Sequence, residues 1–276
     1  MRGLGRVVVV LCAACGGGAP PADEAGTPAQ ALPDQVEVVK DEHAPVLHGY
    51  AQVPSPGETE SALKQAGLET ALHDVVPSWS FHFDKTEPNR VAVRTGVLLA
   101  DLALGAGSDD DAKLLERLAS VRAGLVALGV DSQMLASVDD LVERVKAQAI
   151  PRPELVGVLD RLAGVGVRQL EMQGAPQLVP LVQAGVWLEG TYCVGEAIKQ
   201  HGDAAAADAL LKQPAVVDYF LRYAQAQGVG GASAETAAVL FDSLGRLKAV
   251  ADKAEPLAMA DVEAVVAAAD AVLTQL

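Results

Sequence analysis

Aromatic residues are scarce in this sequence. They make up 4 % of the 276 residues, although half of all residues are apolar. Ala, Val and Leu must therefore fill most of the core. This composition favours closely packed α-helices over a β-sandwich, in which β-branched and aromatic residues would predominate.

Basic residues are also few. The chain has 21 Lys and Arg against 36 Asp and Glu, a formal net charge of −15 at pH 7. A surface of this sign is repelled by nucleic acid and by anionic lipid. Nucleic acid is therefore excluded as a partner, and contact with a membrane has to come from something other than a basic patch.

Familiar catalytic motifs are missing as well. No Gly-x-Ser-x-Gly elbow occurs, and Gly164-Val-Gly166 lacks the Gly-Lys that a phosphate-binding loop requires. The five histidines include no pair at the i, i+4 spacing of a helical metal site, and His43 and His48 have no pair of cysteines beside them. The sequence predicts no metal and no cofactor, and it favours a non-enzymatic protein over an enzyme.

What the sequence does carry is an export signal at its N-terminus. Arg2 and Arg6 form a short basic start, residues 7–11 are an apolar run, and small residues follow. This order is that of a secretory signal. The apolar run is far shorter than the roughly 20 residues that a permanent membrane-spanning helix needs.

The end of the signal, Cys12-Ala-Ala-Cys15, resembles the signal of bacterial lipoproteins, although Cys12 stands where that class usually has Leu. The resemblance implies that residues 1–14 are a signal peptide and that Cys15 becomes an acylated N-terminus, held at a membrane of the bacterial cell envelope. Gly16, where an Asp would favour the inner membrane, points by the same resemblance to the outer membrane. The alternative is an ordinary secretory signal cut within residues 16–19.

Cleavage before Cys15 would remove two arginines and leave a net charge of −17. Cys193 would then be the one free thiol, so that no intramolecular disulfide could form. Residues 15–34 are rich in Gly, Pro and Ala without apolar periodicity, which predicts a disordered tether. We expect residues 35–276 to form a single helical domain, with a candidate sub-boundary near residues 150–175.

Residues 78–84 alternate Trp79, Phe81 and Phe83 with polar residues. This period of two predicts a strand or an extended segment that fills an apolar seam. Three large rings in so short a segment favour a role as core anchors over a ligand site.

From residue 86 onward apolar residues recur at helical spacing. In one segment they are separated by four, three, four and three residues, an apolar stripe along one helix face made by Leu114, Leu118, Val121, Leu125 and Leu128. Connections between such segments are short, as between antiparallel helices. The sequence predicts an all-α fold, an antiparallel bundle of about ten amphipathic helices.

Two of these segments resemble each other. Residues 94–101 read RTGVLLAD and residues 183–190 read QAGVWLEG, so that Gly96 and Gly185 coincide at a spacing of 89. A duplicated helical unit would explain the similarity, and so would chance in a chain rich in Ala, Val and Leu. In either case the small residues would let neighbouring helices approach closely.

The same two segments carry the candidate site residues, which share faces by their three- and four-residue spacings. These are Arg90, Arg94 and Asp101 on one helix, and Glu189, Cys193 and Glu196 on the other. If the helices touch, the arginines could pair with the glutamates. The functional interpretation is a polar pocket with a thiol and acid/base groups. The structural interpretation is a polar face that meets solvent, or a satisfied ion-pair network, with Cys193 as a small buried apolar residue.

Two hypotheses follow. The first is an envelope lipoprotein held at the membrane by its lipid, whose helical domain binds a protein partner or shapes an assembly. The second is a periplasmic helical enzyme or small-ligand carrier that uses the polar faces just named. The anchor, the tether, the acidic surface and the missing motifs favour the first.

Overall fold

The computed structural model describes residues 53–68, 72–108, 110–228 and 233–276. Within them the chain forms eleven α-helices, three short 3-10 helices and no strand, which confirms the predicted all-α fold. The signal, the tether and the stretch with His43 and His48 lie outside the described residues.

The α-helices are α1 Pro56–Gln65, α2 Leu72–Val75, α3 Pro88–Leu104, α4 Asp111–Ala127, α5 Ser132–Lys146, α6 Arg152–Met172, α7 Val179–His201, α8 Ala207–Leu211, α9 Pro214–Gln227, α10 Ala234–Ala251 and α11 Met259–Leu273. The 3-10 helices are η1 Gly105–Gly107, η2 Pro176–Leu178 and η3 Ala204–Ala206.

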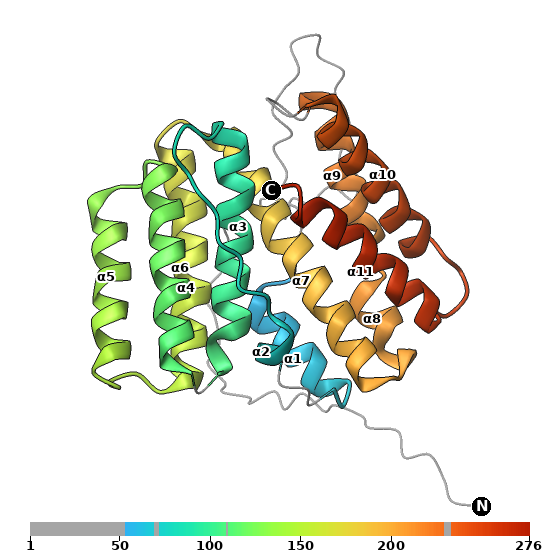
Figure 1. The fold of residues 1–276 in the computed structure, drawn as a ribbon, viewed down its shortest axis with the longest axis horizontal. Coiled ribbons are helices and arrows are strands. Elements are labelled where there is room, and N and C mark those ends of the chain that lie inside the picture. The colour runs from blue at the N-terminus through green and yellow to red at the C-terminus, as the bar shows by residue number, and fades with distance from the viewer. Residues whose placement is uncertain (1–52, 69–71, 109, 229–232) are drawn as a thin grey trace, which may run out of the picture. The chain divides into compact units, whose positions relative to one another are not determined.

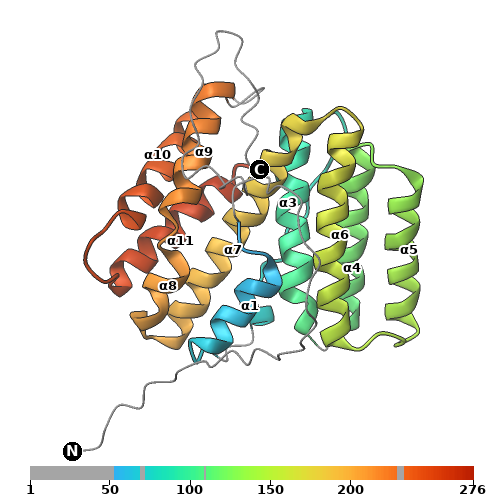
Figure 2. The ribbon, with the colours of Figure 1, turned by 180° about the vertical axis from the view of Figure 1, so that it is seen from behind.

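Helices α3 and α7 lie side by side in the middle of the helical domain, and each carries its own group of helices (Figures 1 and 2). Beside α3, helix α4 packs on α3, α5 packs on α4, and α6 also contacts α3. Beside α7, helix α11 packs on α7, α10 packs on α11, and α9 packs on α10. Short connections between neighbours give the antiparallel packing that the sequence predicts.

Local signals set the ends of several helices. At α1, the Glu58 amide donates to Ser55 Oγ at 3.2 Å and the Ser55 amide donates to Glu58 Oε2 at 2.7 Å, a capping box. Asp110 and Asp131 accept from the first backbone amides of α4 and α5. Helix α7 ends at Gly202, whose φ of 76° costs a glycine little.

The core consists of two hydrophobic clusters. The first includes Leu98 and Leu118 and is built mainly by α3, α4, α5 and α6. The second includes Ile198 and Leu273 and is built mainly by α7 to α11, with α1 packed against it. Since each fully buried aliphatic side chain contributes about 1.5–3 kcal/mol, each cluster stabilises its own group of helices, and the contact of α3 with α7 joins the two groups.

The segment before α3 is extended and is not a strand. Trp79, Phe81 and Phe83 are half-buried, and the residues between them are exposed. Trp79 and Phe81 stack with ring centroids 6.1 Å apart, and both pack against the two hydrophobic clusters. This confirms the predicted extended segment at an apolar seam, and the seam lies between the two clusters.

Gly96 and Gly185 form the closest approach of α3 to α7. A Cβ atom on Gly96 would lie 2.1 Å from the carbonyl oxygen of Val182, and one on Gly185 would lie 2.1 Å from that of Val93. Only glycine leaves room for this contact. Val93 and Val182 are also 89 residues apart, so that exchanging the two helices reproduces the contact.

This exchange symmetry is local. Helix α4, which follows α3 directly, packs on α3, whereas the helix that packs most extensively on α7 apart from α3 itself is α11, the last helix of the described chain. The similar segments are therefore equivalent in their mutual contact, while the helices around them are arranged differently.

We expect Gly96→Ala to destabilise the fold by about 1–3 kcal/mol, because its methyl group overpacks against backbone atoms of α7. Gly190→Ala is the matched control on α7, since a Cβ atom at this position would have no neighbour within 4 Å. The Gly190→Ala substitution should be neutral or stabilise the fold by up to about 1 kcal/mol through helix propensity. Urea unfolding followed by circular dichroism measures the stability of both variants, and equal effects of the two substitutions would contradict the close contact.

Candidate functional site

The structure brings three of the six candidate site residues together and separates the other three. Asp101, Glu189 and Cys193 meet where α3 contacts α7, and all three are buried, with exposed fractions of 1 %, 0 % and 0 %. The glycine contact one or two turns away allows two carboxyl-bearing side chains from distant parts of the sequence to reach each other. We call this group, with Trp79 and Arg117, the buried polar cluster.

Glu189 is the best-connected member of the buried polar cluster. Trp79 Nε1 donates to Glu189 Oε2 at 2.9 Å, and Cys193 Sγ donates to Glu189 Oε1 at 3.3 Å. Burial raises the pKa of Glu189, while the hydrogen bonds from Cys193 and Trp79 act in the opposite direction. These donors favour the ionised carboxylate in a place where water cannot solvate it.

Asp101 is in the opposite situation. Neither of its side-chain oxygens accepts a well-formed hydrogen bond from a described residue. Burial raises its pKa well above the usual value, and the neighbouring Glu189 carboxylate raises it further. A proton held by Asp101 would leave one negative charge in the pair in place of two.

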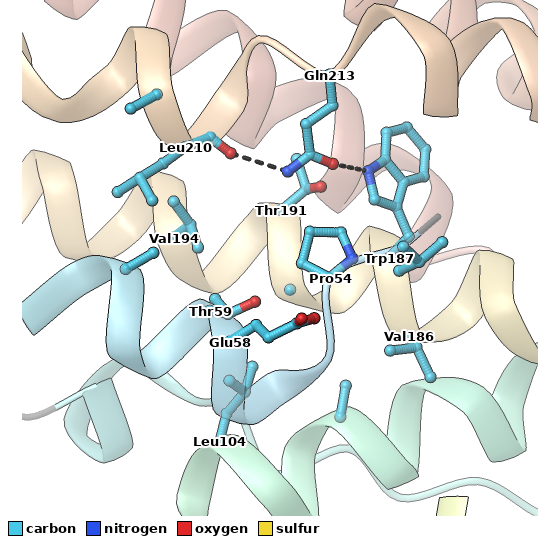
Figure 3. Close-up of a pocket in the computed structure, with 15 residues that line it drawn as sticks. Pro54, Glu58, Thr59, Leu104, Val186, Trp187, Thr191, Val194, Leu210 and Gln213 are labelled. Atoms are coloured by element: carbon cyan, nitrogen blue, oxygen red, sulfur yellow. Dashed lines mark hydrogen bonds between the residues drawn. The ribbon is translucent and has the colours of Figure 1, made fainter. Parts of the chain in front are cut away.

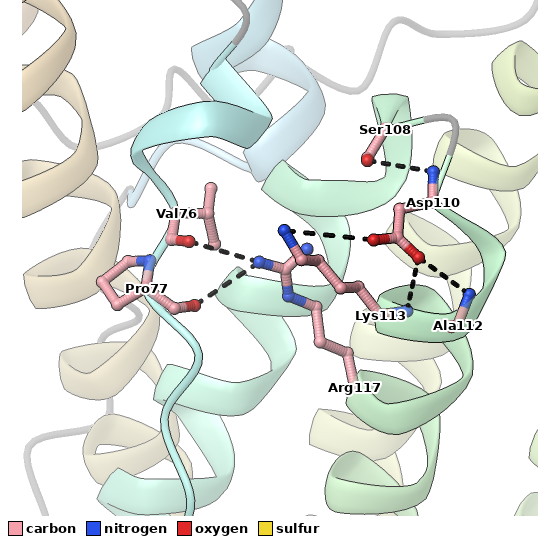
Figure 4. A network of polar contacts seen from close by, with 7 residues as sticks. All are labelled: Val76, Pro77, Ser108, Asp110, Ala112, Lys113 and Arg117. Carbon is pink, nitrogen blue, oxygen red and sulfur yellow. Dashed lines mark hydrogen bonds and ion pairs between the residues drawn. The ribbon is translucent and has the colours of Figure 1, made fainter.

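Arg117 of α4 supplies the positive charge that balances the pair. It lowers the pKa of both Asp101 and Glu189. Arg117 Nη2 donates to the carbonyl oxygen of Val76 at 3.2 Å, which ties α4 to the extended segment before α3 (Figure 4). A Cβ on Gly105 would lie 2.0 Å from Arg117 Nη1, so that this glycine makes room for the guanidinium.

Sequence reasoning missed Arg117, although a signal was present. Arg117 lies three residues after Leu114 and four before Val121, on the buried face of α4. A charged residue within an apolar stripe needs a buried partner, because an unpaired charge in the core is too costly. Asp101, among the buried residues of α3, carries the same signal.

The surroundings of Cys193 disfavour its thiolate form. Burial raises the pKa of its thiol well above the ordinary value, and the Glu189 carboxylate raises it further. The thiolate is the reactive form of cysteine, and this environment keeps the thiol protonated. The interpretation of Cys193 as a small buried residue agrees with this geometry.

The predicted pairing of the arginines with the glutamates is wrong. Arg90 and Arg94 lie near the start of α3, where Arg90 Nε donates to the carbonyl oxygen of Leu276 at 3.0 Å and Arg94 Nε does so at 2.6 Å. Arg94 also donates to the carbonyl oxygen of His82 and lies over the ring of Phe81, 5.3 Å from its centroid. The position of the helix crossing places Asp101, and not the arginines, opposite Glu189.

Glu196 also lies apart from the buried polar cluster. Its carboxylate accepts from Lys199 Nζ at 2.5 Å, one turn along α7. An ion pair of this kind, half-exposed and within one helix, contributes only a few tenths of a kcal/mol, ~0.3–0.5. Glu196 therefore carries no chemistry together with Glu189.

Two cavities lie beside α7, and neither is lined by Asp101, Glu189 or Cys193. The first, of about 620 Å³, lies between α1, α3, α7 and α8 (Figure 3). Gln213 crosses it, accepting from Trp187 Nε1 at 2.9 Å and donating to the carbonyl oxygen of Leu210 at 3.0 Å. The oxygen and the nitrogen of the Gln213 amide are thus both hydrogen-bonded within the protein.

The second cavity, of about 380 Å³, lies between α3, α7, α9, α10 and α11. Its walls are mostly apolar and include Leu188, Phe220 and Leu240, and its charged groups, Arg90 among them, come from the start of α3 and the turn before it. We call it the apolar cavity.

Comparison with protein family models, with curated proteins and with solved structures found no match. In the described part of the chain, no three or more His, Cys, Asp and Glu residues are arranged to hold a metal ion. None of the described helices is long and apolar enough to cross a membrane. The side chains of Asp101, Glu189 and Cys193 in the buried polar cluster are enclosed by the core.

The raised pKa values of Asp101 and Glu189 have a consequence for stability. A carboxyl group whose pKa is raised in the folded state stabilises the fold most at pH values below its unfolded-state pKa, near 4. This stabilisation is lost as the pH rises through the folded-state pKa. We expect Asp101→Asn, which keeps a donor toward Glu189, to reduce the loss of stability as the pH rises. Relative to the unsubstituted protein, the variant should gain about 1–3 kcal/mol between pH 5 and pH 8.

Denaturant unfolding at several pH values measures this difference. Asp139→Asn is the control, because its hydrogen bonds with Arg122 lower the pKa of an exposed carboxylate. Its removal should cost stability at neutral pH and not at acid pH, the opposite sign. Parallel curves for Asp101→Asn and the unsubstituted protein would show that the buried pair does not hold a proton.

Proposed function

We propose that this chain is a lipid-anchored protein of the bacterial cell envelope whose helical domain binds another protein or supports an assembly. The signal that ends at Cys15, with the Gly- and Pro-rich residues after it, supports the anchor. A tether of this composition would hold a domain away from the lipid headgroups.

The observation that carries the choice of a non-enzymatic role is the burial of Asp101, Glu189 and Cys193. A catalytic group has to touch its substrate, and these three side chains are enclosed between α3 and α7. Their bonds to one another and to Trp79 account for them as parts of the core. This burial supports a non-enzymatic role over an enzyme that uses these three side chains.

The envelope address is tested by metabolic labelling with a clickable fatty acid, followed by membrane fractionation. We expect the wild-type protein to be labelled and to sediment with membranes, and Cys15→Ala to lose both properties. Cys12→Leu is the matched control. It changes the other cysteine of the signal to the residue usual in lipoproteins and should keep the label. Labelling that survives in Cys15→Ala would contradict the proposed anchor.

The binding role is tested separately. Affinity purification of the lipidated protein from the membrane fraction should recover a partner in stoichiometric amount, and repeated recovery of the protein alone would count against this role. A second candidate function, the carrying of a small molecule, is favoured by the apolar cavity with its basic edge.

A further inference from the structure

The apolar cavity has the form of a ligand site. Small-molecule sites are concave, of about 300–1,000 Å³, and mostly apolar with a few polar groups. Here α7 contributes Leu188 and α9 contributes Phe220, which lies against Trp187 at a centroid distance of 5.2 Å. Since Trp187 Nε1 already donates to Gln213, the indole offers the cavity no strong polar group.

The wall of the apolar cavity that α10 forms is only partly buried. Leu244 is buried, but Val239 and Leu240, about one turn earlier, are half-exposed although they line the cavity. In a helical domain of this size, apolar side chains that face a cavity and stay half-exposed forgo part of the stabilisation that full burial gives. An apolar ligand between α7, α9 and α10 would supply it.

The charged groups of the cavity are gathered at one edge. The charged side chains among its lining residues are Lys85, Glu87, Arg90 and Arg94, three basic groups and one acidic group. Burial lowers the pKa of Arg94, and the nearby Arg90 lowers it further. Both guanidinium groups donate to an oxygen of Leu276, the last residue of the chain, which offsets part of their mutual repulsion, and a further anion at this edge would offset more of it.

Free donors remain at this edge. Arg94 already donates hydrogen bonds to Leu276, His82 and Thr86. Arg90 uses Nε and Nη2 on carbonyl oxygens at the end of the described chain. Its Nη1 has no partner among the described residues, and Arg90 is exposed.

We propose that the apolar cavity binds a single-chain amphiphile with a carboxylate head group, of the fatty-acid class. The chain lies between α7, α9 and α10, and the carboxylate is bound by Arg90 at the basic edge. The site belongs entirely to the helical domain, so that it does not depend on the lipid anchor proposed above.

The test uses the full chain with Cys15→Ala, which carries no anchor, and three probes of equal chain length below their micelle concentrations. We expect dodecanoate to bind saturably, with one site by calorimetry and a change in Trp187 fluorescence. Dodecanol should bind at least tenfold more weakly and dodecyltrimethylammonium more weakly still, because a charge-assisted hydrogen bond distinguishes the head groups. Equal binding of the three probes, or no binding of dodecanoate, would overturn the proposal.

Variants locate the site. Arg90→Gln should weaken dodecanoate binding about tenfold, while Arg246→Gln, an exposed arginine paired with Asp242 on α10, should not change it. Leu240→Asp places a carboxylate in the cavity and should abolish binding, whereas Phe241→Asp, at the neighbouring exposed position, should not. Circular dichroism confirms that each variant is folded. Loss of binding in both members of a pair would refute the assignment to this cavity, and the lipid-labelling result would be unaffected.

Discussion

The close contact of Gly96 with Gly185 is the constraint on which the rest of the structure depends. Each glycine faces a carbonyl oxygen of the other helix at a distance that no Cβ atom could occupy. Two helix backbones this close to each other place many atom pairs at van der Waals distance. Each pair adds a small dispersion attraction, and the sum over the contact is large. The contact joins two groups of helices that otherwise bury their apolar side chains within themselves.

The same contact brings the members of the buried polar cluster together. Helices that approach this closely bring Asp101 and Glu189 into one small volume from which water is excluded. Two ionised carboxylates there would be strongly unfavourable. The charge of Arg117 and the donors from Trp79 and Cys193 offset part of this cost.

The buried polar cluster and the apolar cavity differ in their access to solvent. The buried polar cluster is inaccessible, whereas the apolar cavity has half-exposed walls and a basic edge at Arg90 and Arg94. An envelope protein tethered through Cys15 would present this cavity close to a membrane, where amphiphiles are concentrated. The anchor and the cavity stand on separate observations and fit one cellular setting.

Features that depend on neighbours along the chain could be predicted from the amino-acid sequence. The period of apolar residues in α4 and the alternation of Trp79, Phe81 and Phe83 are local features of this kind, and both predictions agree with the structure. Local hydrogen bonds and side-chain periodicity decide such elements before any long-range contact forms.

Which helix faces meet depends on tertiary packing. The sequence left open a pairing of Arg90 and Arg94 with the glutamates of α7, and the crossing at the two glycines instead placed Asp101 opposite Glu189 and brought in Arg117 from α4. The rotation and offset of two helices separated by about ninety residues follow from packing across the whole domain. The apolar cavity also depends on tertiary packing, because five helices form its walls and the sequence of no single helix predicts it.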